Sequence, residues 1–243
     1  MKRIFTFLLL LLSLDSFATI AIVASNNTQF AAPASATSAS MNSTGATLIV
    51  IMCTYRTAQS YPTITDSKSN TWTRINNYDG GSGNVSGVVA YYCSNPIVGT
   101  GHTFTETGAN YGAISVFACS GTRTASTPLD QQNGQYIVSL GATATPGSIT
   151  PSANNCIVFT GVMNYNGSAP TMPSGYTAGF TWTTATAYAG GAGYQIQTTA
   201  TATNPSWGNM NAGANGAVNI VSFFEPASAV APPKGGFFYN MLN

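Results

Sequence analysis

Charged side chains are scarce in this sequence of 243 residues. Lys, Arg, Asp and Glu make up 5% of it, as seven bases and six acids with a formal net charge of +1, whereas soluble domains usually contain about a quarter charged residues. A chain with so few charges has no basic stripe for phosphates, which argues against nucleic-acid binding. Its surface must consist largely of Thr, Ser, Asn, Gln and Gly, which respond little to pH or salt.

Helical periodicity is also missing. No window repeats apolar residues at helical spacing between capping residues. The apolar residues, 44% of the chain, instead cluster in strand-length runs, which argues against disorder. Gly, Pro and Asn separate these runs at intervals of about ten residues, a pattern typical of all-β sandwiches.

Cysteine and histidine are few. His102 is the only histidine, and no two cysteines have metal-ligand spacing, so we expect no metal site built on these residue types. In an exported chain, four cysteines allow two disulfides with three connectivities. They equally fit a buried core, where Cys packs as a small hydrophobe. The four are Cys53, Cys93, Cys119 and Cys156.

The first 18 residues have the form of a signal peptide. Lys2 and Arg3 precede the apolar run Ile4–Leu14, and Ser16-Phe17-Ala18 supplies small residues at a cleavage site. The run is short for a membrane span, so we expect cleavage after Ala18 and no span in the mature chain. A retained anchor is the alternative. The predicted setting is secreted, extracellular or virion surface.

An apolar segment within Thr47–Tyr55 recurs later in the chain. Leu48–Ile51 matches Cys156–Phe159, and other matches follow in the same order, including Tyr91 with Tyr194, Phe104 with Trp207 and Ile114-Ser115-Val116 with Val218-Asn219-Ile220. We expect one domain over residues 19–224, with one copy at about 45–121 and a second at about 148–224. The predicted fold is all-β, a two-sheet antiparallel jelly-roll-like sandwich built from an internal duplication.

Strands are expected in the apolar and alternating runs. They cover Thr19–Ser25, Leu48–Thr54, Thr71–Ile75, Val88–Cys93, His102–Thr107, Ala113–Ser120 and Tyr136–Leu140, with equivalents in the second copy. Asp66–Asn70 should form a turn, because Asp and Asn side chains bond nearby backbone groups.

The acidic residues give little support for an enzyme. Glycoside hydrolysis needs two carboxyl groups across a cleft, and only Glu106 and Asp130 lack another explanation. A glycoside hydrolase or lyase on this pair is therefore a minor alternative to a non-enzymatic protein. A serine triad is disfavoured because the nucleophile motif Gly-x-Ser-x-Gly is absent. His102 is read as a residue at a loop edge.

No cofactor is expected. Structural calcium is a minor alternative, because Asp66, Asp79 and Asp130 lie in loops rich in carbonyl oxygens. Turn formation explains the same residues without an ion.

Aromatic residues without a counterpart in the other copy are the candidate ligand-binding residues. The match of Trp72 and Trp207 with aromatics in the other copy favours core packing. The unmatched residues are Trp182, Tyr61, Tyr78 and Tyr165. Their alternative role is ordinary half-buried packing.

Residues 225–243 form a Pro- and Ala-rich linker followed by an aromatic tail that contains Phe237, Phe238 and Tyr239. A loose terminus explains such a tail. The alternative is self-assembly or docking, in which the tail adds to the sheet edge or groove of a partner.

The segments TLIV, TDSKSNTWT, AYYCSNPIVGTGHTFT, AISVFACSG and LDQQNG resemble an uncharacterised jelly-roll domain that recurs in phage virion and bacterial surface proteins. The resemblance spans about Thr19–Phe224, and the N-terminal segment and aromatic tail depart from it. It implies a lectin-like sandwich at a virion or cell surface and brings no catalytic residues. We therefore expect adhesion or carbohydrate binding. The alternative is a structural protomer that assembles through strand edges or its tail.

Overall fold

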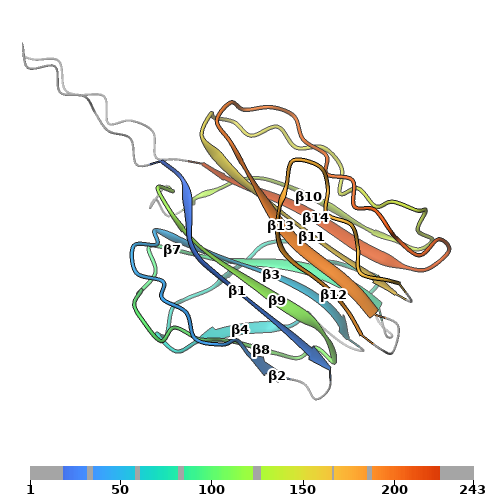
Figure 1. The fold of residues 1–243 in the computed structure, drawn as a ribbon, viewed down its shortest axis with the longest axis horizontal. Helices are drawn as coiled ribbons and strands as arrows, with labels where there is room; N and C mark the ends of the chain where they lie inside the picture. Colours follow the sequence, from blue (N-terminus) through green and yellow to red (C-terminus); the bar gives the residue numbers. More distant parts are fainter. Residues whose placement is uncertain are drawn as a thin grey trace, which may run out of the picture.

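The computed structural model describes residues 19–31, 35–57, 61–81, 85–122, 127–165, 167–184 and 188–224. Every regular element in these ranges is an antiparallel β-strand (Figure 1). The all-β prediction is therefore confirmed. Within the same ranges there is no helix that could cross a membrane. The signal segment 1–18 and the tail 225–243 lie outside the described residues.

Two large sheets make up the centre of the molecule (Figure 1). The first contains, in spatial order, β1 (Ala21–Ala31), β9 (Tyr111–Ser120), β3 (Leu48–Thr57), β7 (Val85–Ser94) and β5 (Thr73–Arg74), and β6 (Tyr78–Asp79) also pairs with β7. The second contains β10 (Leu129–Ile137), β14 (Gly216–Phe224), β11 (Cys156–Tyr165), β13 (Tyr188–Gln197) and β12 (Thr177–Thr183).

A third, small sheet covers the outer face of the first. It consists of β2 (Ser35–Thr37), β8 (Phe104–Thr107) and β4 (Thr63–Asp66). Phe104 and Ile64 from this sheet pack with Ile49 and Ile51 of β3. The predicted antiparallel sandwich is confirmed, and the small sheet of β2, β8 and β4 adds a third sheet to the two that were expected.

The two large sheets have the same strand order. In each sheet the first strand of the chain lies at one edge, followed by the last, the second and the next-to-last, and the remaining shorter strands pair with the next-to-last one. Across the gap β3 faces β11, β9 faces β13 and β7 faces β14. The central strand β3 therefore faces its own counterpart, and β7 and β9 each face the counterpart of the other, as in an isologous interface. This arrangement is what an internal duplication would produce, and the duplication itself stays a hypothesis.

The faces of the strands correct the residue matches within β3 and β11. Leu48 lies in the core between the two large sheets, whereas its sequence match Cys156 lies on the outer face of the second sheet. β3 and β11 each pair with the last strand of their own sheet, and this pairing gives a different match. Ile49 lies opposite Ala118 and Val158 lies opposite Ser222, so Ile49 corresponds to Val158. The predicted match is therefore out by one residue, which reverses every side chain because strand periodicity is two.

Both large sheets are buried on both faces. The core between them includes Val50 and Met52 of β3 and Ile157 and Phe159 of β11. On the outer face of the second sheet, loops take the place of a covering sheet and place Trp207 against the strands. This double burial explains why the sequence at the start of β3 is apolar without alternation.

Strand limits differ most where the strands are polar. Tyr136–Leu140 was predicted as a strand, but β10 spans Leu129–Ile137, a polar edge strand with half-buried side chains. The other predicted strands fall on observed ones, and Asp66 begins the predicted turn by accepting hydrogen bonds from the backbone N–H groups of Lys68 and Asn70.

Candidate functional site

One end of the sandwich carries a groove of about 470 Å³, here called the Tyr165 groove. It forms where β10 and β11 end and β14 begins. The exposed fractions of Val138 and Tyr165, 77% and 41%, are large for apolar side chains. The lining residues are Val138, Tyr165, Asn211, Ala212, Gly213, Ala214 and Asn215. An exposed aromatic ring beside amide groups suits a ligand with both apolar faces and hydroxyl groups.

Tyr165 is held in place by backbone and ring contacts. Its backbone N–H donates a 3.0 Å hydrogen bond to the carbonyl oxygen of Asn215. Its ring lies 5.3 Å from the ring of Tyr188, which is 6% exposed and stacks at 5.0 Å on Tyr111. These contacts fix the ring before any ligand arrives, which lowers the entropic cost of binding.

Two buried amide oxygens lie at this end without a hydrogen-bond donor among the described residues. One is Asn215 Oδ1, in the lining of the Tyr165 groove. The other is Asn164 Oδ1 of a fully buried side chain. A buried acceptor without a donor costs about 1–3 kcal/mol, and both oxygens are covered by protein atoms, so a ligand hydroxyl would reach either one only after a neighbouring side chain had moved.

Asn164 lies beside a second, smaller hollow. This hollow has a volume of about 150 Å³ and is lined by Gly167, Ser168, Asn209, Met210 and Asn211. Asn164 Nδ2 contacts the sulfur of Met210, and a Cβ on Gly167 would collide with Asn164 Oδ1. Asn211 lines both hollows, so they adjoin. Together they offer room for more than one ring of a polymeric ligand.

Three of the four predicted aromatic residues lie at this end, but one is not a surface residue. Trp182 is 3% exposed and lies in the core between the large sheets, so its prediction as an exposed ligand-binding residue is wrong. Tyr78 packs half-buried against the same core cluster. Tyr61 lies elsewhere, half-buried beside the small sheet, with the guanidinium of Arg74 3.6 Å above its ring.

Sequence reasoning did not find the other residues of the groove. Asn215 and Asn211 occupy a turn-rich segment that resembles an ordinary connection. Val138 was expected within a strand and instead follows β10. The only available signal was Tyr165, which has no aromatic counterpart in the other half of the sequence.

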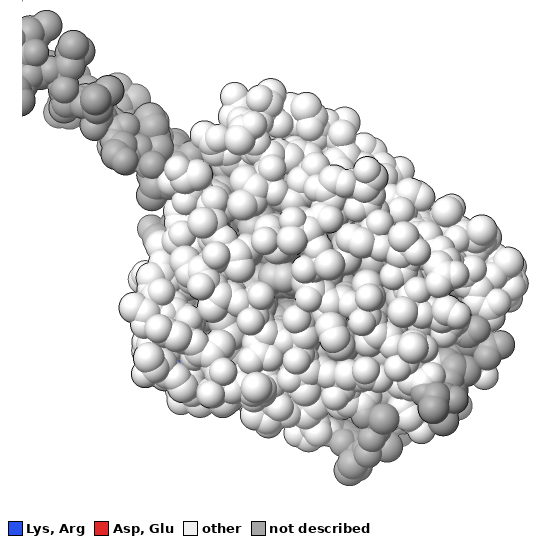
Figure 2. Space-filling view, in the orientation of Figure 1, with Lys and Arg blue, Asp and Glu red and all other residues white. Residues whose placement is uncertain are grey.

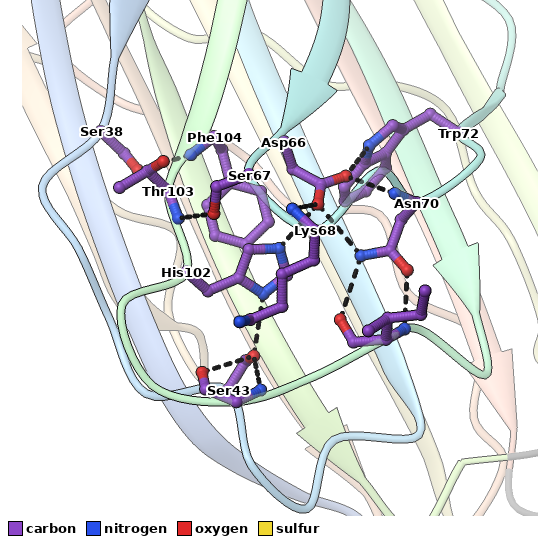
Figure 3. Close-up of polar contacts among 12 residues, drawn as sticks. Ser38, Ser43, Asp66, Ser67, Lys68, Asn70, Trp72, His102, Thr103 and Phe104 are labelled. Atoms are coloured by element: carbon purple, nitrogen blue, oxygen red, sulfur yellow. Dashed lines mark hydrogen bonds and ion pairs between the residues drawn. The ribbon is translucent and has the colours of Figure 1, made fainter.

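A buried cluster around Asp66 combines a serine, a histidine and an aspartate (Figure 3). His102 Nδ1 lies 2.8 Å from Ser43 Oγ, and His102 Nε2 lies 3.0 Å from Asp66 Oδ1. Asp66 also accepts a 2.8 Å hydrogen bond from the indole N–H of Trp72. The side chains of Ser43, His102 and Asp66 are fully buried, and His102 lies just before β8, at the loop edge where it was expected.

The geometry of this cluster suits cross-linking of loops rather than acyl transfer. In a serine triad the serine bonds Nε2 and the aspartate bonds Nδ1, and here the two partners are exchanged. Ser43 Oγ also accepts a hydrogen bond from the backbone N–H of Gly99. Burial lowers the pKa of His102, against the opposing effect of Asp66. The imidazole is therefore neutral at pH 7 and connects three loops.

Glu106 and Asp130 do not face a common cleft. Glu106 lies in β8 of the small sheet and is fully buried, and burial raises its pKa to about 7. Asp130 lies in β10 of the second large sheet and accepts hydrogen bonds from Ser152 and Ser222. The first large sheet separates the two, which removes the basis for a glycosidase built on this pair.

The three loop acids are held separately. Asp66 is surrounded by the donors described above, Asp79 accepts hydrogen bonds from Tyr55 and Asn77, and Asp130 belongs to another sheet. Among the described residues, no three His, Cys, Asp or Glu side chains form a group that could hold a metal ion. The arrangement favours turn formation over calcium coordination.

The four cysteines are buried, as the core interpretation predicted, and all are free thiols in this structure. The structure does not support the disulfide alternative, because the four thiols lie in different parts of the core. Cys53 lies in the core under the small sheet, Cys119 in the core between the large sheets and Cys156 on the outer face of the second. Cys93 is on β7, separated from β9 by β3.

Comparisons with known proteins give no relative for this chain. No protein-family model matches it, and neither a curated protein nor a solved structure does. The argument for function therefore depends on the geometry of the Tyr165 groove.

Proposed function

We propose that this chain is an exported, non-enzymatic β-sandwich that binds a carbohydrate or a similar hydroxyl-rich polymer in the Tyr165 groove. One observation carries the proposal: a fixed, half-exposed tyrosine ring lines a groove whose wall also contains the amide residues Asn211 and Asn215. A sugar presents an apolar ring face to such a tyrosine and hydroxyl groups to such amides.

The charge-poor surface supports the same function. Figure 2 shows a face of the molecule on which almost no Lys, Arg, Asp or Glu is visible. Neutral polar surfaces recognise ligands by hydrogen bonding and shape rather than by long-range attraction. A ligand rich in hydroxyl groups fits such a surface.

The proposed setting is the outside of a cell or a virion. Its support is the signal-like segment at residues 1–18 and the resemblance to jelly-roll domains of phage and bacterial surface proteins. In that setting the Tyr165 groove would serve adhesion to a surface glycan. The sandwich would act as a rigid scaffold that carries binding loops at one end.

A glycan array probed with the full secreted protein, with and without calcium, tests the proposal. We expect binding to a defined group of glycans that does not need calcium. Tyr165→Ala should weaken that binding roughly tenfold or more, because a central aromatic contact is often worth above 1 kcal/mol. Thermal unfolding of the variant checks that the loss is local.

Ile97→Ala is the matched control, because Ile97 is an equally apolar residue that is 63% exposed but lies away from the groove. It should bind as the wild type does. Equal losses in both variants, or wild-type binding by Tyr165→Ala, would remove the Tyr165 groove as the binding site.

A further inference from the structure

Arg56, at the end of β3, lies against the stacked rings of Tyr111 and Tyr188, one ring away from Tyr165 of the groove. Its guanidinium carbon is 4.9 Å from the ring centre of Tyr188 and 5.7 Å from that of Tyr111. Tyr188 is also the residue on which Tyr165 packs. The cation and the exposed ring of the groove therefore share one neighbour.

The positive charge of Arg56 has no counter-ion within the described part of the chain. Its Nε is buried without a hydrogen-bond partner there, and no described carboxylate lies within ion-pair distance of its guanidinium. Asp79, bonded to the neighbouring Tyr55, takes its hydrogen bonds from Tyr55, Asn77 and Gly81 instead. An arginine held by aromatic faces keeps its planar fork available for a carboxylate or sulfate.

We propose that Arg56 forms an anion subsite of the groove, so that the preferred ligand is an acidic glycan carrying carboxylate or sulfate groups. This inference rests on the proposed function and adds the class of ligand. Tyr165 would contact a sugar ring while Arg56 pairs with an acidic substituent on the same or the next ring. On a surface with so few charges, a single unpaired cation decides the charge preference locally.

Matched polysaccharides provide the test. Polygalacturonate is compared with its fully methyl-esterified form for the carboxylate arm, and dextran sulfate with dextran for the sulfate arm. The wild type should bind one acidic polymer about tenfold or more tightly than its neutral partner at low salt, since a charge-assisted hydrogen bond is worth more than a neutral one. The preference should shrink in 0.5 M NaCl.

Three variants test whether Arg56 causes the preference for the acidic polymer. Arg56→Gln should bind acidic and neutral polymers equally, and Arg56→Lys should keep part of the preference because it keeps the charge. Arg74→Gln is the control, because Arg74 also lies over a tyrosine ring but beside the small sheet. It changes net charge by the same amount and should bind as the wild type does.

The outcomes separate the two proposals. If the neutral polymer binds as well as the acidic one, or Arg74→Gln acts as Arg56→Gln does, the anion subsite is wrong while the groove stands. If binding to every polymer and every arrayed glycan is absent, both proposals fail. If Arg56→Gln unfolds at the wild-type temperature and loses only the acidic preference, the subsite is established.

Discussion

The indole nitrogen of Trp182 donates a 3.0 Å hydrogen bond to Thr54 Oγ1, which joins β12 of one large sheet to β3 of the other. Thr54 in turn donates to the carbonyl oxygen of Ala113. A second chain of the same kind links Trp207 through Thr160 to the carbonyl oxygen of Asn219. Each large sheet thus has a central strand whose threonine accepts a hydrogen bond from the indole N–H of a buried tryptophan.

Trp182→Phe should lower the free energy of unfolding by about 1 kcal/mol, because it leaves Thr54 Oγ1 without its donor. Trp182→Ala should cost roughly 3–5 kcal/mol, because it also opens a cavity. Urea titration measures both. In a double-mutant cycle, Trp182→Phe and Thr54→Val should cost less together than the sum of their separate losses. Simple additivity would show that the hydrogen bond contributes nothing to stability.

Asp66→Asn should destabilise the protein by roughly 2–4 kcal/mol at pH 7, because an amide cannot accept from all the donors around this side chain. Burial alone would raise the pKa of Asp66, but the hydrogen bonds from Lys68 N–H, His102 and Trp72 lower it below its usual value.

A lowered pKa means that the contribution of Asp66 is present above about pH 4 and is lost as pH falls through the folded-state pKa. The difference between wild type and Asp66→Asn should therefore shrink below pH 3, as followed by thermal unfolding across pH. A difference that stays constant from pH 7 to pH 2 would contradict the charged role of Asp66.

For Glu106 we expect a pH dependence of stability that has the opposite sign. Burial raises its pKa from 4.5 to about 7, because the hydrogen bond from Ala109 N–H does not compensate for lost solvent. The folded state then binds more protons than the unfolded state between these values, so stability falls as pH rises from 4.5 to 7 and is level above. The loss should amount to roughly 3 kcal/mol.

Glu106→Gln should remove that slope while keeping an acceptor for Ala109. The measurement is the urea midpoint between pH 4.5 and pH 8 for both proteins. Asp130→Asn is the control, because it removes one carboxylate from the second large sheet, far from the small sheet that holds Glu106, and its partners there are Ser152 and Ser222. A slope that persists in Glu106→Gln would assign it to another group.

The cysteines should be unreactive in the folded protein. All four are buried, and burial raises the pKa of Cys93 and Cys156 to about 11. Iodoacetamide at pH 8 should therefore leave the native protein unmodified, since the thiolate is the reactive form. Mass spectrometry after unfolding in denaturant without a reductant should show four modified cysteines. Two or none would indicate disulfides.

The sequence indicated the long strands well, because the apolar runs in β3 and β11 have the length of strands and lack helical periodicity. It did not indicate which face each residue occupies, since both faces of these strands are buried and alternation is lost. The one-residue error between Leu48 and Cys156 follows directly from that. β10 was misplaced because an edge strand of mixed burial has weak periodicity.

The candidate site was less predictable from sequence. Trp182 has no aromatic counterpart, which suggested exposure, but β12 turns its side chain inward toward Thr54. Tyr165 was identified for the same reason and is half-exposed. Nothing local distinguishes the two residues. The unpaired oxygens of Asn164 and Asn215 depend on contacts between separate loops, which no pattern along the chain records.

The central positions of β3 and β11 have a consequence for the dynamics of the molecule. Each has a hydrogen-bonded neighbour on both sides and a packed layer on both faces. Their amide protons can meet solvent only when both halves come apart at once, since partial opening of an outer strand leaves them covered. Hydrogen exchange should therefore be slowest in these two strands and occur there in a single cooperative event, although they lie far apart along the chain.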